Sequence, residues 1–253
     1  MKFLQYIICI LLFSTNIKLF SQTPAELFQE ANNAYQSENY EKAGELYEQI
    51  LDKGYIAPEV YFNLGNTYFK SNQIARAILN YERAKLYDPA NEDINYNLEL
   101  ARTRIVDRIE ILPQLEFISW WKNMIHSYSP LTWAMLSILC FTLFLGFLLV
   151  YFFSSRSGIK RLFFWLALPV FIISIVTFSF SKTQNQYITN HDKAIVITPT
   201  ITVKGSPDEE STDLFVLHEG TKVTLEDQIG DWREIKLSDG NKGWIKAEAV
   251  EAI

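Results

Sequence analysis

Cysteine and histidine are scarce in this sequence: its 253 residues include two Cys and three His. Cys9 lies in an apolar N-terminal stretch and Cys140 in a longer apolar run, so neither polar part of the chain can form an internal disulfide. The three histidines, His126, His191 and His218, are far apart and follow no metal-binding spacing. We therefore expect no Cys-based zinc site, no other metal site and no cofactor.

Motifs typical of enzymes are also missing. The sequence contains neither a Gly-x-Ser-x-Gly nucleophile elbow nor a phosphate-binding Gly-rich loop. Acidic side chains are plentiful, but they fall on the polar faces of predicted helices, where solvated charge is their ordinary role. These absences predict a protein that is not an enzyme.

Clusters of basic residues are absent from the polar parts of the chain. Residues 22–129 carry 10 basic and 16 acidic side chains, a net charge of −6, and residues 182–253 carry 8 and 13, a net charge of −5. A surface that binds nucleic acid needs clustered Lys or Arg to neutralise phosphates. The charge balance therefore argues against a nucleic-acid partner.

Two long runs contain no charged residue at all. Residues 131–153 and 162–181 are each long enough, as helices, to cross a hydrocarbon core of roughly 30 Å. The alternative, a pair of buried core helices, is disfavoured because such helices rarely run this far without a charge. The basic loop between the runs, residues 154–161, holds three basic residues and no acid, so the positive-inside rule places it in the cytoplasm. Both polar parts are then expected in the periplasm, outside a bacterial inner membrane.

The N-terminal residues 1–21 have the layout of a secretory signal peptide. Lys2 precedes an apolar run over residues 3–13, and the small Ser21 precedes the expected cleavage point. If the segment is not cleaved, it becomes an additional membrane anchor, and the orientation of the chain in the membrane stays the same.

Residues 113–130, just before the first apolar run, predict an amphipathic helix at the membrane interface. Leu115, Ile118, Trp121 and Ile125 recur there at helical spacing, and aromatic residues are concentrated as they are at bilayer edges. Such a helix would hold the preceding region close to the lipid bilayer.

A 34-residue period organises the region from residue 22 to 112. On a ruler that starts at Pro58, Gly65 falls at position 8, Ala77 at 20 and Tyr81 at 24, which resembles the tetratricopeptide repeat. Small residues at positions 8 and 20 let the two helices of a repeat cross closely, and aromatic side chains fill the space around them. A more divergent copy precedes this repeat, and a single capping helix with Leu98 follows it.

The resemblance implies an inner face that binds a segment of a partner protein. Aromatic residues and Asn alternate along it, so rings could bury partner side chains while Asn pairs with a peptide amide. The alternative is that these residues only cover the helix surface. The candidate partner-binding groove consists of Phe28, Asn32, Tyr35, Phe62, Asn66, Phe69 and Lys70.

Residues 193–253 change to short β-branched runs separated by turn signals, which predict a small β-barrel. The order of residues resembles bacterial SH3-like domains, which bind peptides or wall components and are not catalytic. We expect Trp232 and Trp244 to belong to the barrel core or rim rather than to a ligand site. The matching residues are Val203, Pro207, Leu217, Glu219, Gly220, Thr221, Val223, Trp232, Ile235, Asp239, Gly240, Gly243, Trp244 and Ile245.

The order of segments along the chain resembles the BatE-like tetratricopeptide proteins of the Bacteroides aerotolerance (Bat) group. Residues 54–70, 77–102 and 212–223 carry that resemblance. It implies a partner role in a membrane complex with von Willebrand-type Bat proteins and a MoxR-type ATPase, linked to aerotolerance or envelope stress.

We thus expect a multidomain membrane protein with an α-solenoid of tetratricopeptide repeats, a two-helix transmembrane hairpin, a linker over residues 182–192 and an all-β SH3-like barrel. Its expected function is that of a non-enzymatic scaffold or adaptor for partner proteins. The alternative function is that of an envelope sensor that binds peptidoglycan and signals through the transmembrane hairpin.

Overall fold

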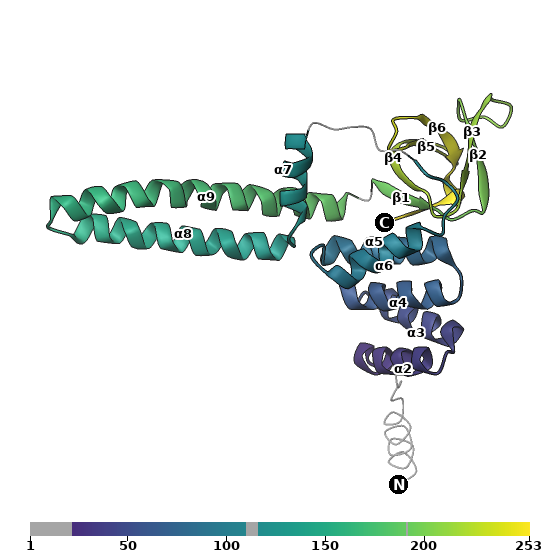
Figure 1. Cartoon of the computed structure of the whole chain (residues 1–253), viewed down its shortest axis with the longest axis horizontal. Helices are drawn as coiled ribbons and strands as arrows, with labels where there is room; N and C mark the ends of the chain where they lie inside the picture. Colours follow the sequence, from purple (N-terminus) through teal and green to yellow (C-terminus); the bar gives the residue numbers. More distant parts are fainter. Residues whose placement is uncertain (1–21, 110–115, 191) are drawn as a thin grey trace, which may run out of the picture. The chain divides into compact units, whose positions relative to one another are not determined.

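The structure, a computed structural model, describes residues 22–109, 116–190 and 192–253 (Figure 1). The predicted signal peptide lies outside the described residues. The chain forms two compact units, residues 1–55 and 56–253, and each is described by itself.

The first unit contains one helical pair, α2 (Pro24–Gln36) and α3 (Tyr40–Asp52). α2 starts with a capping box, in which the Thr23 hydroxyl accepts from the Glu26 N–H and the Glu26 carboxylate accepts from the Thr23 N–H. Ala31 and Ala43 are fully buried, as expected for the small positions of a repeat.

Three helices begin the second unit: α4 (Pro58–Lys70), α5 (Ile74–Tyr87) and α6 (Glu92–Arg102). At Gly65, a Cβ atom would lie 2.6 Å from Tyr81 Cδ1, far inside van der Waals contact, which explains the small residue at this position. α6 is capped at its N-terminus by Asn91, whose side chain accepts hydrogen bonds from the N–H groups of Asp93 and Ile94. α6 packs against α5 and ends the helical stack.

The next three helices are α7 (Glu116–His126), α8 (Pro130–Phe153) and α9 (Ser157–Thr189). α8 and α9 pack side by side as a hairpin (Figure 1). Both are long and apolar enough to cross a membrane. Two serines join them, because Ser137 Oγ donates to the Ser174 carbonyl oxygen at 2.9 Å and Ser174 Oγ donates to the Ser137 carbonyl oxygen at 3.1 Å.

The helix that contains the predicted span of residues 162–181 extends beyond it at both ends. α9 begins at Ser157 and ends at Thr189, so Lys160 and Arg161 are helical rather than part of a loop, and most of the predicted linker is helical. Hydropathy delimits the uncharged part of a helix, but the helix itself ends where capping and packing allow. The polar end of α9 packs through Gln184, whose side-chain oxygen lies 2.5 Å from His126 Nδ1.

The amphipathic helix α7 ends at His126, before the predicted limit at residue 130, and residues 113–115 lie outside the described residues. Its Trp121 ring packs edge-on against Phe180 of α9, with 5.3 Å between ring centroids. Trp133 of α8 packs against the same ring, and its indole N–H donates to the Ile125 carbonyl oxygen at 3.0 Å. α7 is therefore held against the hairpin by aromatic contacts.

An antiparallel sheet completes the second unit. Its strands are β1 (Lys193–Val196), β2 (Thr200–Lys204), β3 (Asp213–His218), β4 (Lys222–Ile229), β5 (Trp232–Lys236), β6 (Lys242–Lys246) and β7 (Val250–Ala252). The strand order is β3-β2-β6-β5-β4-β1-β7. The buried core of the sheet consists of Ala194, Val196, Val203, Leu217, Val223, Ile235, Leu237 and Ile245.

The strand pairing gives an open sheet rather than the predicted closed barrel. β3 and β7 lie at opposite ends of the strand order, and no pairing among the described strands joins them. The register of β3 shifts opposite Val203 and Lys204, and β7 has only three residues. Bulges and short edge strands limit further pairing. Turn signals in the sequence indicate which neighbouring strands pair, but closure depends on distant strands.

Candidate functional site

The predicted groove residues of the first unit have partners within their own helical pair. The Tyr47 hydroxyl donates to Asn32 Oδ1 at 2.6 Å, and the Phe28 ring lies edge-on to Tyr47 with 5.9 Å between centroids. Tyr35 packs edge-on against Tyr40 at 5.4 Å. Phe28, Asn32 and Tyr35 are half-buried on α2. Contacts with α3 therefore position the two rings and the Asn32 amide.

The second unit repeats this arrangement 34 residues later. The Tyr81 hydroxyl donates to Asn66 Oδ1 at 2.8 Å, and the Asn97 side-chain amide donates to the same oxygen at 2.8 Å. Phe62 packs against the Tyr81 ring at 6.0 Å. The carbonyl oxygen of Asn66 therefore orients Tyr81 and Asn97, and only its amide nitrogen is left to donate to a peptide carbonyl.

Exposed apolar side chains continue this surface onto α6. Tyr96 and Leu100 are one helical turn apart, and their side chains are 69% and 39% exposed. They stand out because most of the other residues of α6 are polar. Phe69 is half-buried beneath the Arg104 guanidinium, 5.8 Å from the ring centroid. We call the surface formed by Phe62, Asn66, Phe69, Tyr96 and Leu100 the α4–α6 face. Lys70 is exposed at the C-terminal end of α4.

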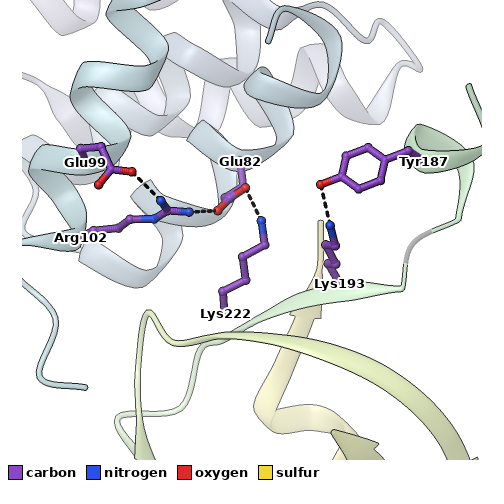
Figure 2. Close-up of polar contacts among 6 residues, drawn as sticks. All are labelled: Glu82, Glu99, Arg102, Tyr187, Lys193 and Lys222. Carbon is purple, nitrogen blue, oxygen red and sulfur yellow. Dashed lines mark hydrogen bonds and ion pairs between the residues drawn. The ribbon is translucent and has the colours of Figure 1, made fainter. Parts of the chain in front are cut away.

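A buried carboxylate on α5 connects the helices to the sheet. Glu82 is 5% exposed, and its two oxygens accept from Lys222 Nζ of β4 at 2.6 Å and from the Arg102 guanidinium of α6 at 2.5 Å (Figure 2). Burial raises the pKa of Glu82, but the charges of Lys222 and Arg102 lower it by more, so its pKa lies below the ordinary value. The arrangement is a fully paired buried charge.

Two further residues before α7, Arg83 and Asp107, bond to the sheet. Arg83 donates to Glu251 Oε1 at 3.0 Å and to the Ala252 carbonyl oxygen at 2.5 Å. Asp107, which follows α6, accepts from the His218 N–H and the Thr221 hydroxyl, each at 2.7 Å. Burial raises the pKa of Asp107, but these hydrogen bonds lower it by more, to below its ordinary value.

The end of α9 contacts the first strand of the sheet. Lys193 Nζ donates to the Tyr187 hydroxyl at 2.6 Å and lies 4.0 Å from the centroid of its ring (Figure 2). A small hollow beside this pair is lined by Leu86, Tyr187, Asp192, Lys193, Lys222 and Ile253. Within the described ranges, no group of three His, Cys, Asp or Glu side chains could hold a metal ion.

Sequence reasoning missed the buried role of Glu82, because it assigned acidic residues to solvated faces. A signal for it exists: Glu82 follows Ile78 by four residues and Leu79 by three, which places it on the apolar stripe of α5. A carboxylate on such a stripe needs a cationic partner. The sequence does not indicate that one partner comes from a strand 140 residues away.

Comparison with known families identifies the central helical pair. A family model described as tetratricopeptide repeat matches residues 58–91, which contain α4 and α5. The match confirms the repeat register that starts at Pro58, and the chain therefore contains a tetratricopeptide repeat. No curated protein matches the chain.

Proposed function

We propose that this protein is a non-enzymatic scaffold that binds a segment of a partner protein on the α4–α6 face. Tetratricopeptide repeats generally mediate interactions between proteins, which supports this function. The observation that carries it is the exposure of Tyr96 and Leu100, one turn apart on α6, because exposed apolar side chains on one face are typical of interaction sites. Phe28, Asn32 and Tyr35 occupy the corresponding repeat positions on α2.

The chemistry of the α4–α6 face favours a partner segment with apolar and acidic side chains. The rings of Phe62, Phe69 and Tyr96 offer apolar contact, and the Asn66 amide nitrogen can donate to a backbone carbonyl. Lys70 and Arg104 follow at the C-terminal ends of α4 and α6, where they would attract a carboxylate.

The proposed scaffold is anchored in a bacterial inner membrane by α8 and α9. Only 6% and 17% of their most apolar windows are buried, so most of their large apolar side chains need a lipid environment. The Ser137–Ser174 hydrogen bonds are of the kind that join helices within lipid. The basic residues near the α8–α9 connection favour a cytoplasmic position for it, with the repeats and the sheet in the periplasm.

The resemblance to the Bat group suggests the setting of this scaffold. We propose that its partners are von Willebrand-type membrane proteins within a Bat-type complex that contributes to aerotolerance or resistance to envelope stress. The acidic balance of the polar parts supports protein partners rather than nucleic acid.

Site-specific photo-crosslinking of the full chain in cells tests the proposed face. A photoreactive residue at Tyr96 should capture a partner, whereas one at Tyr55, which is also an exposed tyrosine, should not. Replacing Leu100 by Ala in the Tyr96 variant should reduce capture, because the neighbouring apolar contact is lost. Equal capture of the same proteins from both positions, unaffected by Leu100→Ala, would rule out the α4–α6 face as the binding site.

The second candidate function, a peptidoglycan sensor, is favoured by the contact between α9 and the sheet. Lys193 of β1 is bonded to Tyr187 of α9, so a ligand on the sheet could affect the hairpin. The full chain in lipid nanodiscs should then sediment with purified peptidoglycan, and empty nanodiscs should not. A chain that stays in the supernatant at every peptidoglycan concentration would remove this candidate.

A further inference from the structure

We infer that residues 218–222, which are the turn between β3 and β4 and the strand residue on each side of it, form an intramolecular docking element that fastens the sheet to α5. The sheet thereby serves as the C-terminal cap of the helical repeats. This role goes beyond partner binding, because the surface to which the sheet binds belongs to the same chain. We call residues 218–222 the docking turn.

A cap is needed because the buried residues of α5 are not limited to the side that packs against α4, the other helix of its repeat. Its partners are α4, α6 and β1, and α6 is the last helix of the stack. Terminal elements of repeat arrays must cover the final apolar face and present a polar surface to water. The buried residues of α5 are Ala75, Ala77, Ile78, Leu79, Asn80, Tyr81, Glu82 and Ala84.

Gly220 lets the docking turn approach the helices closely. A Cβ atom at Gly220 would lie 2.4 Å from Ile105 Cγ2 and 3.3 Å from Ile78 Cδ1, so any larger residue would push the turn away. Gly220 also has a φ of +87°, a conformation that glycine adopts most readily. The same residue thus meets the backbone requirement of the turn and the steric requirement of docking.

The polar groups of the docking turn have partners on the helical side. Asp107 accepts from the His218 N–H, its Oδ1 lies 2.7 Å from His218 Nδ1, and it also accepts from the Thr221 hydroxyl. Lys222, the first residue of β4, reaches the buried Glu82. Because β3 is an edge strand, Asp107 also covers an N–H that would otherwise be open to pairing with another chain.

The docking turn overlaps the residues that carry the SH3-like resemblance, since Gly220 and Thr221 belong to both. Their contacts with Ile105 and Asp107 leave this side of the sheet unavailable to a soluble ligand. A peptide or wall component bound by the sheet would need another face.

Hydrogen–deuterium exchange on the full chain in detergent micelles tests the docking turn. Gly220→Ala should speed amide exchange in residues 92–109 by about tenfold, because the segment after α6, which holds Ile105 and Asp107, loses its contacts with the turn. Gly230→Ala is the matched control, since Gly230 also has positive φ but a Cβ there would meet nothing within 4 Å. Exchange in residues 92–109 that is equally fast in both variants would overturn the inference.

A second pair of variants avoids any strain in the turn. Lys222→Gln removes the ion pair with buried Glu82, whereas Lys242→Gln removes an exposed pair with Glu226 on the same sheet. Faster exchange in residues 92–109 for Lys222→Gln alone supports docking. If Gly220→Ala unfolds the sheet itself, this pair decides, and wild-type exchange in Lys222→Gln would refute the docking role.

Discussion

Gly65 sets the distance between the two helices of the identified repeat. Its backbone faces the Tyr81 ring, and the Tyr81 hydroxyl in turn bonds to Asn66, one residue after the glycine. Tyr47 and Asn32 form the same bond in the first helical pair. Tyr81, at position 24 of the repeat, therefore has two roles. Its ring fills the space beside Gly65 at position 8, and its hydroxyl fixes the side chain of Asn66 at position 9.

Gly65→Ala should destabilise the repeat although Ala is the better helix former. The new methyl group would overlap Tyr81, and overpacking of this kind costs about 1–3 kcal/mol against a propensity gain of about 1 kcal/mol. Thermal unfolding followed by circular dichroism measures the change. Gly146→Ala is the control, because a Cβ at this helical glycine meets nothing within 4 Å. Equal melting temperatures of wild type and Gly65→Ala would contradict the close approach.

Glu82 should make the attachment of the sheet dependent on pH. Its pKa in the folded protein is lowered relative to 4.5, so its contribution to stability is fully present above about pH 4.5 and is lost as pH falls through the folded pKa. Asp107, whose pKa is also lowered, acts in the same direction. Acid should therefore weaken the junction, whereas raising the pH from 5 to 7 should leave it unchanged.

The comparison of wild type with Glu82→Gln isolates this effect. At pH 7 the variant should lose about 3–5 kcal/mol of unfolding free energy, because Lys222 and Arg102 lose their shared negative charge. The difference in melting temperature should shrink below about pH 4.5, where the Glu82 carboxylate takes up a proton in the unfolded chain more readily than in the folded one. Glu226→Gln, an exposed carboxylate, should change little. A difference that stays constant down to pH 3 would show that the Glu82 charge does not hold the junction.

At the scale of elements, the α8–α9 hairpin depends on the register of its two helices. Ser137 Oγ and Ser174 Oγ lie 3.4 Å apart, and each hydroxyl also donates to the other helix's backbone. Both side chains are buried between helices whose other faces are strongly apolar. The two serines therefore define which residues face each other.

Cysteines at positions 137 and 174 should form a disulfide in membranes. In a chain with Cys140 replaced by Ser, oxidation of Ser137→Cys/Ser174→Cys should link the helices, since the two side chains already touch. The control is Ser137→Cys/Ser179→Cys, because Ser179 is exposed and donates to Ile175 of its own helix. Mass spectrometry of proteolysed chain detects the link. A link in the control pair but not in the 137–174 pair would mean a different register.

The periodicity of the sequence was sufficient to predict elements whose signal is local. Gly65, Ala77 and Tyr81 fixed the repeat register, and uncharged runs located two apolar helices. Helix ends were predicted less well, because Lys160 and Arg161 interrupt hydropathy without interrupting α9. Sheet closure and the Glu82–Lys222 pair depend on residues far apart in sequence, which no local pattern encodes.

The candidate site shows the same division between local and distant information. Repeat positions located Asn32 and Asn66 on their helices, but the hydrogen bonds from Tyr47 and Tyr81 show that their carbonyl oxygens orient rings within the helical pairs. A pattern indicates which face a side chain occupies, whereas the partner of a particular atom depends on three-dimensional packing. The role of the groove residues in binding stays a prediction.

For the whole molecule, the proposed topology requires the repeats and the sheet to lie on the same side of the membrane. α8 and α9 form a hairpin, so the segments before α8 and after α9 emerge together if both helices cross. The contact of Glu82 with Lys222 would be impossible with the repeat helices and the sheet on opposite sides. Topology and intramolecular docking therefore depend on each other.

Labelling of single cysteines with a membrane-impermeant maleimide tests this topology in the full chain with Cys9 and Cys140 replaced by Ser. In cells with a permeabilised outer membrane, Glu41→Cys and Glu210→Cys, both exposed, should be labelled at once. Ser155→Cys, in the short connection between α8 and α9, should react only after the inner membrane is broken, because the neighbouring Arg156, Lys160 and Arg161 favour the proposed cytoplasmic position. Labelling of Ser155→Cys in unbroken cells would exclude the proposed orientation.

Labelling of only one of positions 41 and 210 would place the repeats and the sheet on opposite sides of the membrane, and the junction at Glu82 could then not form.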